Sequence, residues 1–338
     1  MKKKIIQYVK EYNVPDILAM VRNGRLDPII CNDSFSDKLV VISGTTSGIG
    51  YSAARKYASL GANLLCINRN PEKSEALKVE IESEFGIQCD YKIVDLSNFE
   101  EVHRLAEELR QLPTAIDVLI HNAGVYLTRR EQTSKGLEKV FMVQHLSSFI
   151  INFVLMDKLK AQDKARIILV NSEAHRFAPW GLRVDDLNWE KRSYSGLRSY
   201  GSAKLAQLLS MFVFEEHFKG SMVTINSMHP GAVKSQSGRE NGPVYRWLKR
   251  NFLEKSLRPT EIAAESLYYL GVSKEIEGVS GKFFNITKQE VPAPPALDVG
   301  ASYDIWEKSL EYAELQDVQW ETHRQIPFDL NRAQKHYG

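Results

Sequence analysis

From Lys38 onward, short apolar runs alternate with longer stretches of helical periodicity, and this alternation restricts the possible folds more than any other feature of the sequence. The apolar runs, rich in β-branched residues, predict strands at Leu39–Ser43, Ala62–Ile67, Gln88–Val94, Val118–Ile120, Arg166–Val170 and Val223–Asn226. The stretches between them predict helices such as Gly48–Ser59, Pro71–Phe85 and Phe99–Gln111. Apolar strands that alternate with helices are typical of a parallel sheet covered on both faces. The sequence therefore predicts a doubly wound α/β fold.

The N-terminal residues 1–37 differ from this central part. Two short stretches, around Ile5–Tyr12 and Ile17–Val21, have helical apolar spacing, and we expect a helical extension docked on the main domain. Because the chain starts with a lysine cluster, Lys2–Lys4, the alternative is a helix at a membrane surface or on a partner protein.

We expect the remainder to form one domain over residues 38–290, since no linker interrupts it. Residues 291–338 are then a connector, a helix near Ser302–Glu314 and a polar tail, because Pro292–Pro295 is a stiff, proline-rich segment.

Composition excludes several classes of protein. The 44 Lys and Arg residues against 42 Asp and Glu give a net charge of +2 and no basic footprint for a nucleic acid, and a 43% hydrophobic content excludes disorder. The three cysteines form no C-x-x-C pair, which suits a reducing compartment. No run approaches the roughly 18 apolar residues of a membrane span, and the start lacks the apolar core of a secretory signal. We therefore expect a cytoplasmic protein.

A glycine-rich turn, Ser43–Gly50, separates the first predicted strand from the first predicted helix. Its glycines allow a tight turn and a close approach to a ligand, and the helix start supplies free N–H groups for a pyrophosphate. An ordinary strand–helix turn is the alternative. The position of this turn inside a βαβ unit favours nucleotide binding.

The spacing Gly44-x-x-x-Gly48-x-Gly50 resembles that of the short-chain dehydrogenase/reductase family, and further motifs follow in the family's order. These motifs are His121-Asn122-Ala123-Gly124, Ser172, Tyr200-x-x-x-Lys204 and His229-Pro230-Gly231. Shorter segments look like the retinol-dehydrogenase-like branch, namely Val143–Leu146, Ala174-His175, His229–Ser235, Ser280–Phe284 and Ile305–Glu307. The resemblance implies a Rossmann fold with a nicotinamide cofactor over residues 38 to about 285.

The resemblance also implies which residues contact the cofactor. They are Gly44, Thr46, Ser47, Gly48, Ile49, Gly50, Arg69, Asp95, Leu96, Asn122, Ala123, Gly124, Tyr200, Lys204, Pro230, Gly231, Val233 and Ser235.

The residues after the second strand favour NADP(H) over NAD(H). An acidic residue at that point would bind the ribose 2′-hydroxyl of NAD, whereas an arginine accommodates the 2′-phosphate of NADP. This chain has Asn68-Arg69-Asn70 and no acid there. The alternative is that Arg69 is a solvated surface residue. Asp95 matches the family's contact with the adenine amino group, or else caps the next helix.

By resemblance, Ser172, Tyr200 and Lys204 carry the catalysis. Tyr200 and Lys204 lie four residues apart, on one face of a helix. Because the usual pKa of tyrosine is about 10, we expect the ammonium and the oxidised nicotinamide to lower it toward the working range. Tyr200 then gives its proton to the substrate oxygen, Lys204 binds the nicotinamide ribose, and Ser172 hydrogen-bonds that oxygen. Asn171 is the alternative to Ser172.

Gln144 departs from the family pattern. The family has an asparagine there, which helps to hold a water in a proton relay from the lysine to solvent. The longer side chain of Gln144 either holds that water in an altered geometry or indicates slower turnover or another proton route. We expect Gln144 to take part in catalysis.

Four histidines lie near these motifs, namely His121, His145, His175 and His229. No two of them are spaced four apart on one helix, and hydride transfer in this family needs no metal. We therefore expect packing roles for them and no metal site.

Aromatic residues gather in two segments, 173–197 and 236–258. Either they line a pocket for a bulky apolar ketone, aldehyde or alcohol, such as a retinoid, steroid or polycyclic compound, or they only pack the segments on the sheet. Because cellular NADP is mostly reduced, a carbonyl reductase is the expected activity.

Two other functions are kept as alternatives. One is a cofactor-binding regulatory or structural protein with little turnover, and the other is a reductase of an activated C=C or C=N bond. The resemblance further implies a homodimer or homotetramer that pairs through the helices at about 133–161 and 197–218.

Overall fold

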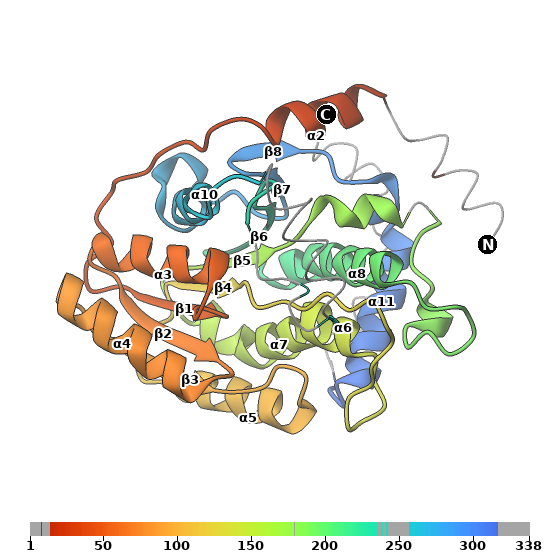
Figure 1. Ribbon diagram of the computed structural model, residues 1–338, viewed down its shortest axis with the longest axis horizontal. Coiled ribbons are helices and arrows are strands. Elements are labelled where there is room, and N and C mark those ends of the chain that lie inside the picture. Colours follow the sequence, from red (N-terminus) through yellow and green to blue (C-terminus); the bar gives the residue numbers. More distant parts are fainter. Residues whose placement is uncertain are drawn as a thin grey trace.

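An eight-stranded sheet runs through the centre of the protein, and its first seven strands are parallel (Figure 1). The computed structural model describes residues 8, 14–178, 180–234, 238, 241–242 and 257–316. The strands are β1 (Leu39–Ser43), β2 (Asn63–Asn68), β3 (Cys89–Ile93), β4 (Val118–His121), β5 (Ala165–Val170), β6 (Val223–His229), β7 (Phe283–Asn285) and β8 (Lys288–Glu290). Their order is β3-β2-β1-β4-β5-β6-β7-β8, with β8 antiparallel to β7. The order reverses between β1 and β4, where open α/β sheets bind their ligands.

Helices cover both faces of this sheet (Figure 1). One face carries α3 (Gly48–Ser59), α4 (Pro71–Phe85) and α10 (Glu261–Val272), and the other carries α5 (Phe99–Arg110), α7 (Ser147–Lys160) and α8 (Gly196–His217). Within β1, Val40 and Ile42 pack toward the first layer and Val41 toward the second, because successive strand residues point to opposite faces. The doubly wound Rossmann fold is confirmed.

Local sequence signals explain where the helices begin. The side chain of Asn70 accepts a hydrogen bond from the backbone N–H of Lys73 at the start of α4, and Asn98 does the same for Glu101 in α5. α4 ends at Gly86, which has a left-handed φ of 69°. These caps account for the agreement between predicted and observed helix bounds.

The predicted strands and helices that lie within the described residues are confirmed at or close to their expected bounds, apart from the start of one helix, and two strands were not predicted. β7 and β8 were not predicted, because three-residue strands carry little periodic signal. The long helix expected over 133–161 begins instead with the short α6 (Lys139–Phe141) and a π-helical turn, Met142–Leu146.

The second of the two expected N-terminal helices is present as α2 (Val14–Asn23), and it docks on the end of the sheet. The side-chain amide of Asn285 donates to the carbonyl of Met20 at 3.1 Å. The first expected helix lies outside the described residues except for Tyr8, whose ring is buried and whose hydroxyl donates to Asp298.

The C-terminal helix α11 (Val299–Tyr312) packs across α7 and α8. Its Trp306 is fully buried against Phe149 and Phe153 of α7 and Phe214 of α8. Within the described ranges, one helical stretch, 139–160, is long and apolar enough to cross a membrane, but 78% of its most apolar window is buried inside the protein. That stretch is therefore a core helix.

Candidate active site

The turn between β1 and α3 has the geometry of an anion site. Gly44 and Gly48 have φ values of 76° and 60°, which favour glycine, and a Cβ on Gly44 would lie 3.0 Å from the Cα of Ala123. A Cβ on Gly50 would lie 2.1 Å from the carbonyl oxygen of Gly44, so this glycine allows the helix to pack on the turn. Gly50 therefore serves packing and does not line the cavity described next.

The start of α3 is left without a side-chain cap. Ser47 makes no capping hydrogen bond, and the first turn of α3 contains no acidic residue. The first backbone N–H groups of the helix are thus available to an anion, in a positive dipole field. This observation fits a dinucleotide pyrophosphate at this turn.

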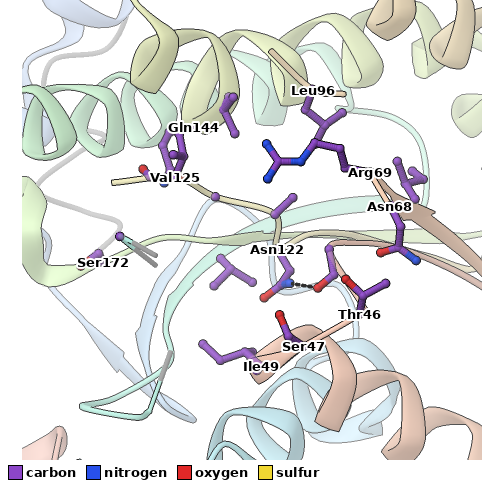
Figure 2. A pocket seen from close by; sticks show the side chains of 18 of the residues that line it. Thr46, Ser47, Ile49, Asn68, Arg69, Leu96, Asn122, Val125, Gln144 and Ser172 are labelled. Carbon is purple, nitrogen blue, oxygen red and sulfur yellow. Dashed lines mark hydrogen bonds between the residues drawn. The ribbon is translucent and has the colours of Figure 1, made fainter. Parts of the chain in front are cut away.

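A cavity of about 490 Å³ lies at the carboxyl ends of the parallel strands, next to the uncapped helix start. Figure 2 shows Ser172 on one side of it and Asn68 and Arg69 on the other. The predicted residues that line it are Gly44, Thr46, Ser47, Gly48, Ile49, Arg69, Asp95, Leu96, Asn122, Ala123, Gly124, Gln144, Ser172, Tyr200, Lys204, Pro230, Gly231 and Val233. Ser235 lies outside the described residues.

Two basic side chains, Arg69 and Lys73, lie on the side of the cavity near β2, next to the glycine turn. Asn68 accepts hydrogen bonds from the backbone N–H of Thr45 at 2.8 Å and from its hydroxyl at 3.1 Å, so its side chain holds the glycine turn. Arg69 is exposed, and its guanidinium is directed toward the cavity in Figure 2. Lys73, which was not predicted, lines the same side. Its position in the first turn of α4, just after the predicted Arg69, was the sequence feature that could have indicated it.

Asp95 has hydrogen bonds inside the protein. Its carboxylate accepts from the backbone N–H of Ser97 at 2.9 Å and from the Ser97 hydroxyl at 2.8 Å. The cap of α5 itself is Asn98. Asp95 thus forms a local turn while it lines the cavity, and its predicted adenine contact stays a prediction.

Tyr200, Lys204 and Ser172 converge on the cavity from α8 and the end of β5. The Lys204 ammonium lies 5.8 Å from the centre of the Tyr200 ring. Burial raises the pKa of Tyr200 to about 12, and the Ser172 hydroxyl acts in the opposite direction. Burial also lowers the pKa of Lys204 to about 7. In the chain alone the tyrosine pKa therefore moves away from neutrality, because burial penalises the charged forms of both groups.

Asn171 also lines the cavity, but its side chain is bonded to α8. Its side-chain amide donates to the carbonyl of Lys204 at 3.0 Å and to the side-chain oxygen of Gln207 at 2.9 Å, while its own oxygen accepts from the backbone of Ser172. These bonds use its side chain to fasten α8 to β5. Ser172 is therefore the better candidate for the substrate contact.

Gln144 lies in the π-helical turn, and its side chain is buried at the cavity wall. Its amide nitrogen donates to the carbonyl of Val125 at 2.8 Å, and its amide oxygen has no hydrogen-bond partner among the described residues. A buried acceptor without a partner is costly unless a ligand or water satisfies it. This side chain thus offers an acceptor to a molecule bound in the cavity.

Gln207 was missed by the sequence reasoning, although it lies three residues after Lys204 on the same face of α8. Its amide oxygen lies 3.5 Å from the Lys204 ammonium, and its amide nitrogen donates to the backbone carbonyl of Gln144 at 3.0 Å. The only available signal was that spacing.

The described aromatic residues between Ser172 and Gly196 make packing contacts and do not line this cavity. Trp189 is 4% exposed and contacts Tyr194 and Arg192. Trp180 and Leu182 pack against the main core cluster. These contacts favour the packing alternative, and the pocket alternative stays a prediction. The side chain of Phe177 and most of 236–258 lie outside the described residues.

Three of the four histidines near the motifs have hydrogen bonds to different partners. His121 pairs with Asn152 at 2.8 Å, His145 with Ser309 at 2.7 Å, and His175 with the carbonyl of Ser172 at 2.8 Å. Within the described ranges, no group of three or more His, Cys, Asp or Glu residues is arranged to hold a metal ion.

Known proteins share both this sequence pattern and this fold. Residues 38–183 match the family model described as short chain dehydrogenase. Retinol dehydrogenase 13 of Homo sapiens is 34% identical over 285 residues, which cover 80% of this chain and 83% of that protein. A solved structure from Mycobacterium paratuberculosis has a TM-score of 0.66 at 25% identity, covering 84% of this chain and 96% of its own.

A further solved structure supports the fold alone. It is a short chain dehydrogenase from Shigella flexneri, complexed with NADP, with a TM-score of 0.58 at 20% identity, covering 76% of this chain and 99% of its own. The family model, the human relative and the arrangement of Ser172, Tyr200 and Lys204 agree with one another. The chain belongs to the short-chain dehydrogenase family, whose oxidoreductases use NAD(H) or NADP(H).

Proposed function

We propose that this protein is an NADP(H)-dependent oxidoreductase that interconverts a carbonyl and an alcohol on a bulky apolar substrate, and that it acts as a carbonyl reductase. The observation that carries the proposal is the convergence of Ser172, Tyr200 and Lys204 on one cavity that also includes the uncapped start of α3. A dinucleotide would be held by its pyrophosphate at that helix start, in the same cavity as the residues that would bind and protonate a carbonyl substrate.

The cofactor supplies the hydride when it is bound, and this chain supplies the proton and the orientation. Tyr200 holds a proton on its phenol oxygen at neutral pH, because burial raises its pKa to about 12. It donates that proton to the substrate oxygen. The Ser172 hydroxyl donates a hydrogen bond to the same oxygen and so fixes its position. Lys204 provides a cation beside the phenol, which stabilises the phenolate left after proton transfer.

The preference for NADP(H) rests on charge. Arg69 directs a guanidinium toward the cavity, Lys73 lines the same side, and residue 68 is an asparagine. A guanidinium is a planar fork of donors that suits a phosphate. These residues would hold the 2′-phosphate of NADP.

The substrate class rests on the relatives and on the cavity. Retinol dehydrogenase 13 is named for an apolar alcohol, and apolar residues such as Val125, Val143 and Val233 line the cavity of this chain. A retinoid-, steroid- or polycyclic-like ketone, aldehyde or alcohol fits both observations.

The proposed location is the cytoplasm, and the proposed assembly is a homodimer or homotetramer. Cys31, Cys66 and Cys89 are buried free thiols, which favours the reducing cytoplasm. A homodimer or homotetramer stays a prediction. Because Trp306 of α11 covers α7 and α8, pairing through those helices would require a surface outside the area that α11 occupies.

The test is NADPH oxidation by the purified full chain with a panel of carbonyl compounds. Retinaldehyde, a steroid ketone and a polycyclic ketone represent the proposed class, and an enone and an imine represent the alternative reaction. We expect consumption of NADPH with the bulky carbonyl compounds and its loss in Tyr200→Phe, by roughly 10²–10⁴-fold. Turnover with only the enone or the imine would instead identify a reductase of an activated C=C or C=N bond. NADPH binding without any turnover would favour a regulatory protein.

A further inference from the structure

Lys204 is a buried cation, and among the described residues it has no carboxylate partner in its hydrogen bonds. Its side chain is 3% exposed. The ammonium donates to the carbonyl of Val170 at 2.7 Å and lies 3.5 Å from the amide oxygen of Gln207. A buried ammonium with neutral acceptors depends on the orientation of their dipoles, because no opposite charge holds it.

The orientation of the Gln207 amide is fixed by three bonds. Its nitrogen donates to the backbone carbonyl of Gln144 at 3.0 Å, and its oxygen accepts from Asn171 at 2.9 Å while it faces Lys204. The reverse orientation would place an N–H group against both the ammonium and the Asn171 amide. Only the observed orientation satisfies all the partners, and it directs the negative end of the amide dipole at the ammonium.

The Gln144 carbonyl that holds this amide belongs to the π-helical turn Met142–Leu146. A π-helical turn changes the hydrogen-bond ladder of a helix and often marks a functional site. Gln207 thus connects that turn on one side with Lys204 and β5 on the other. An amide carries no exchangeable acid of useful pKa, so this connection positions the lysine and does not conduct a proton.

We propose that Gln207 is a positioning residue for Lys204, which orients the ammonium toward the cavity by presenting a neutral acceptor anchored on the π-helical turn. The consequence for turnover rests on the proposed function, whereas the effect on Lys204 itself does not. Within the part of the chain that the structure describes, the titratable groups that face this lysine are Tyr200 on α8, His121 on β4 and His145 in the π-helical turn. Burial lowers the pKa of Lys204 to about 7, so a change in its acceptors is measurable near neutral pH.

Two substitutions of Gln207 should move the pKa of Lys204 in opposite directions. Gln207→Glu places a carboxylate beside the ammonium and raises that pKa by about one unit or more, because an opposite charge favours the charged form. Gln207→Met keeps the length of the side chain but removes the acceptor, and lowers it. Both variants lose the bond to Gln144, so both lose some stability.

The experiment follows the side-chain resonance of Lys204 against pH in full-length protein with isotope-labelled lysine, assigned with Lys204→Arg. We expect the Lys204 pKa to be highest in Gln207→Glu, intermediate in the wild type and lowest in Gln207→Met. As a matched control, Gln162→Glu and Gln162→Met alter an amide that bonds the backbone of Ile116 and the carbonyl of Lys164, and should leave Lys204 unchanged. An unchanged Lys204 pKa in both Gln207 variants, with only stability reduced, would assign Gln207 a purely structural role and overturn the proposal.

The same proteins separate this inference from the proposed function. If both hold, the alkaline limits of NADPH binding and of kcat/KM shift in the same order as the Lys204 pKa. If the resonance shifts in that order but no variant, wild type included, turns over a carbonyl substrate, the positioning role stands and the proposed function fails.

Discussion

The side-chain amide of Gln144 lies directly over the Cα of Gly124: a Cβ at residue 124 would lie 2.7 Å from the amide nitrogen and 3.0 Å from the amide oxygen. The glycine of the Asn-Ala-Gly motif therefore makes room for the residue that departs from the family pattern. The bond from Gln144 to the carbonyl of Val125 keeps the amide there.

Gly124→Ala should displace this amide. We expect turnover to fall roughly tenfold and stability to fall by about 1–2 kcal/mol, since the new methyl breaks a buried hydrogen bond. The double variant Gly124→Ala with Gln144→Asn should recover part of the loss, because the shorter amide leaves space for the methyl. Steady-state kinetics and urea unfolding measure both effects. Full activity in Gly124→Ala would show that the amide has no fixed position.

Arg69→Asp should reverse the preference between the two nicotinamide cofactors. An acid at this position repels a 2′-phosphate and accepts from a ribose hydroxyl, so we expect NADPH affinity to fall roughly tenfold or more and NADH affinity to hold or rise. Fluorescence titration with each cofactor measures this. Arg104→Asp on α5 is the control, since its side chain is 62% exposed. Equal losses of affinity for NADPH and NADH would show that Arg69 does not contact the 2′-phosphate.

The sequence predicted the parts of the site that depend on local patterns. The glycine turn and the Tyr200–Lys204 pair have short, fixed spacings, so both could be read directly. Gln207 could not be found in this way, because its partner Gln144 lies 63 residues earlier in the chain. The same applies to Asn171, whose amide role depends on how closely α8 approaches β5.

The aromatic residues after Ser172 show why the substrate pocket was harder to predict. Trp189 has a positive φ of 57° and packs against Tyr194 and Arg192, an arrangement that no periodicity indicates. Composition gave two alternatives for this segment, and only tertiary contacts distinguish them. In the described part of the chain, Trp180 and Trp189 make packing contacts.

Trp306→Ala should test how much α11 contributes to the core. Removing a fully buried tryptophan that contacts Phe149 and Phe214 should lower the free energy of unfolding by about 3–5 kcal/mol. It should also increase self-association, because it exposes aromatic rings of α7 and α8. Chemical unfolding and light scattering measure the two effects. A loss below about 1 kcal/mol would show that α11 does not form part of the core in solution.

Lys204→Met should change how stability depends on pH. The pKa of Lys204 falls from its ordinary value of 10.5 to about 7 on folding, because its side chain is buried. Between these two values the unfolded chain binds more protons than the folded one, so the free energy of unfolding of the wild type rises with pH across this window. Below about pH 7 both states are protonated, and this contribution no longer changes.

Lys204→Met removes that rise and should be more stable than the wild type at pH 7 by roughly 1 kcal/mol or more, while it loses turnover. Urea unfolding from pH 6 to pH 10 measures the slope in each protein. Lys164→Met is the control, because that side chain is 56% exposed and should leave the slope in place. A wild-type stability with the same slope as Lys204→Met from pH 7 to pH 10 would mean that Lys204 keeps its ordinary pKa in the folded protein. The buried ammonium would then be compensated by contacts stronger than two neutral oxygens provide.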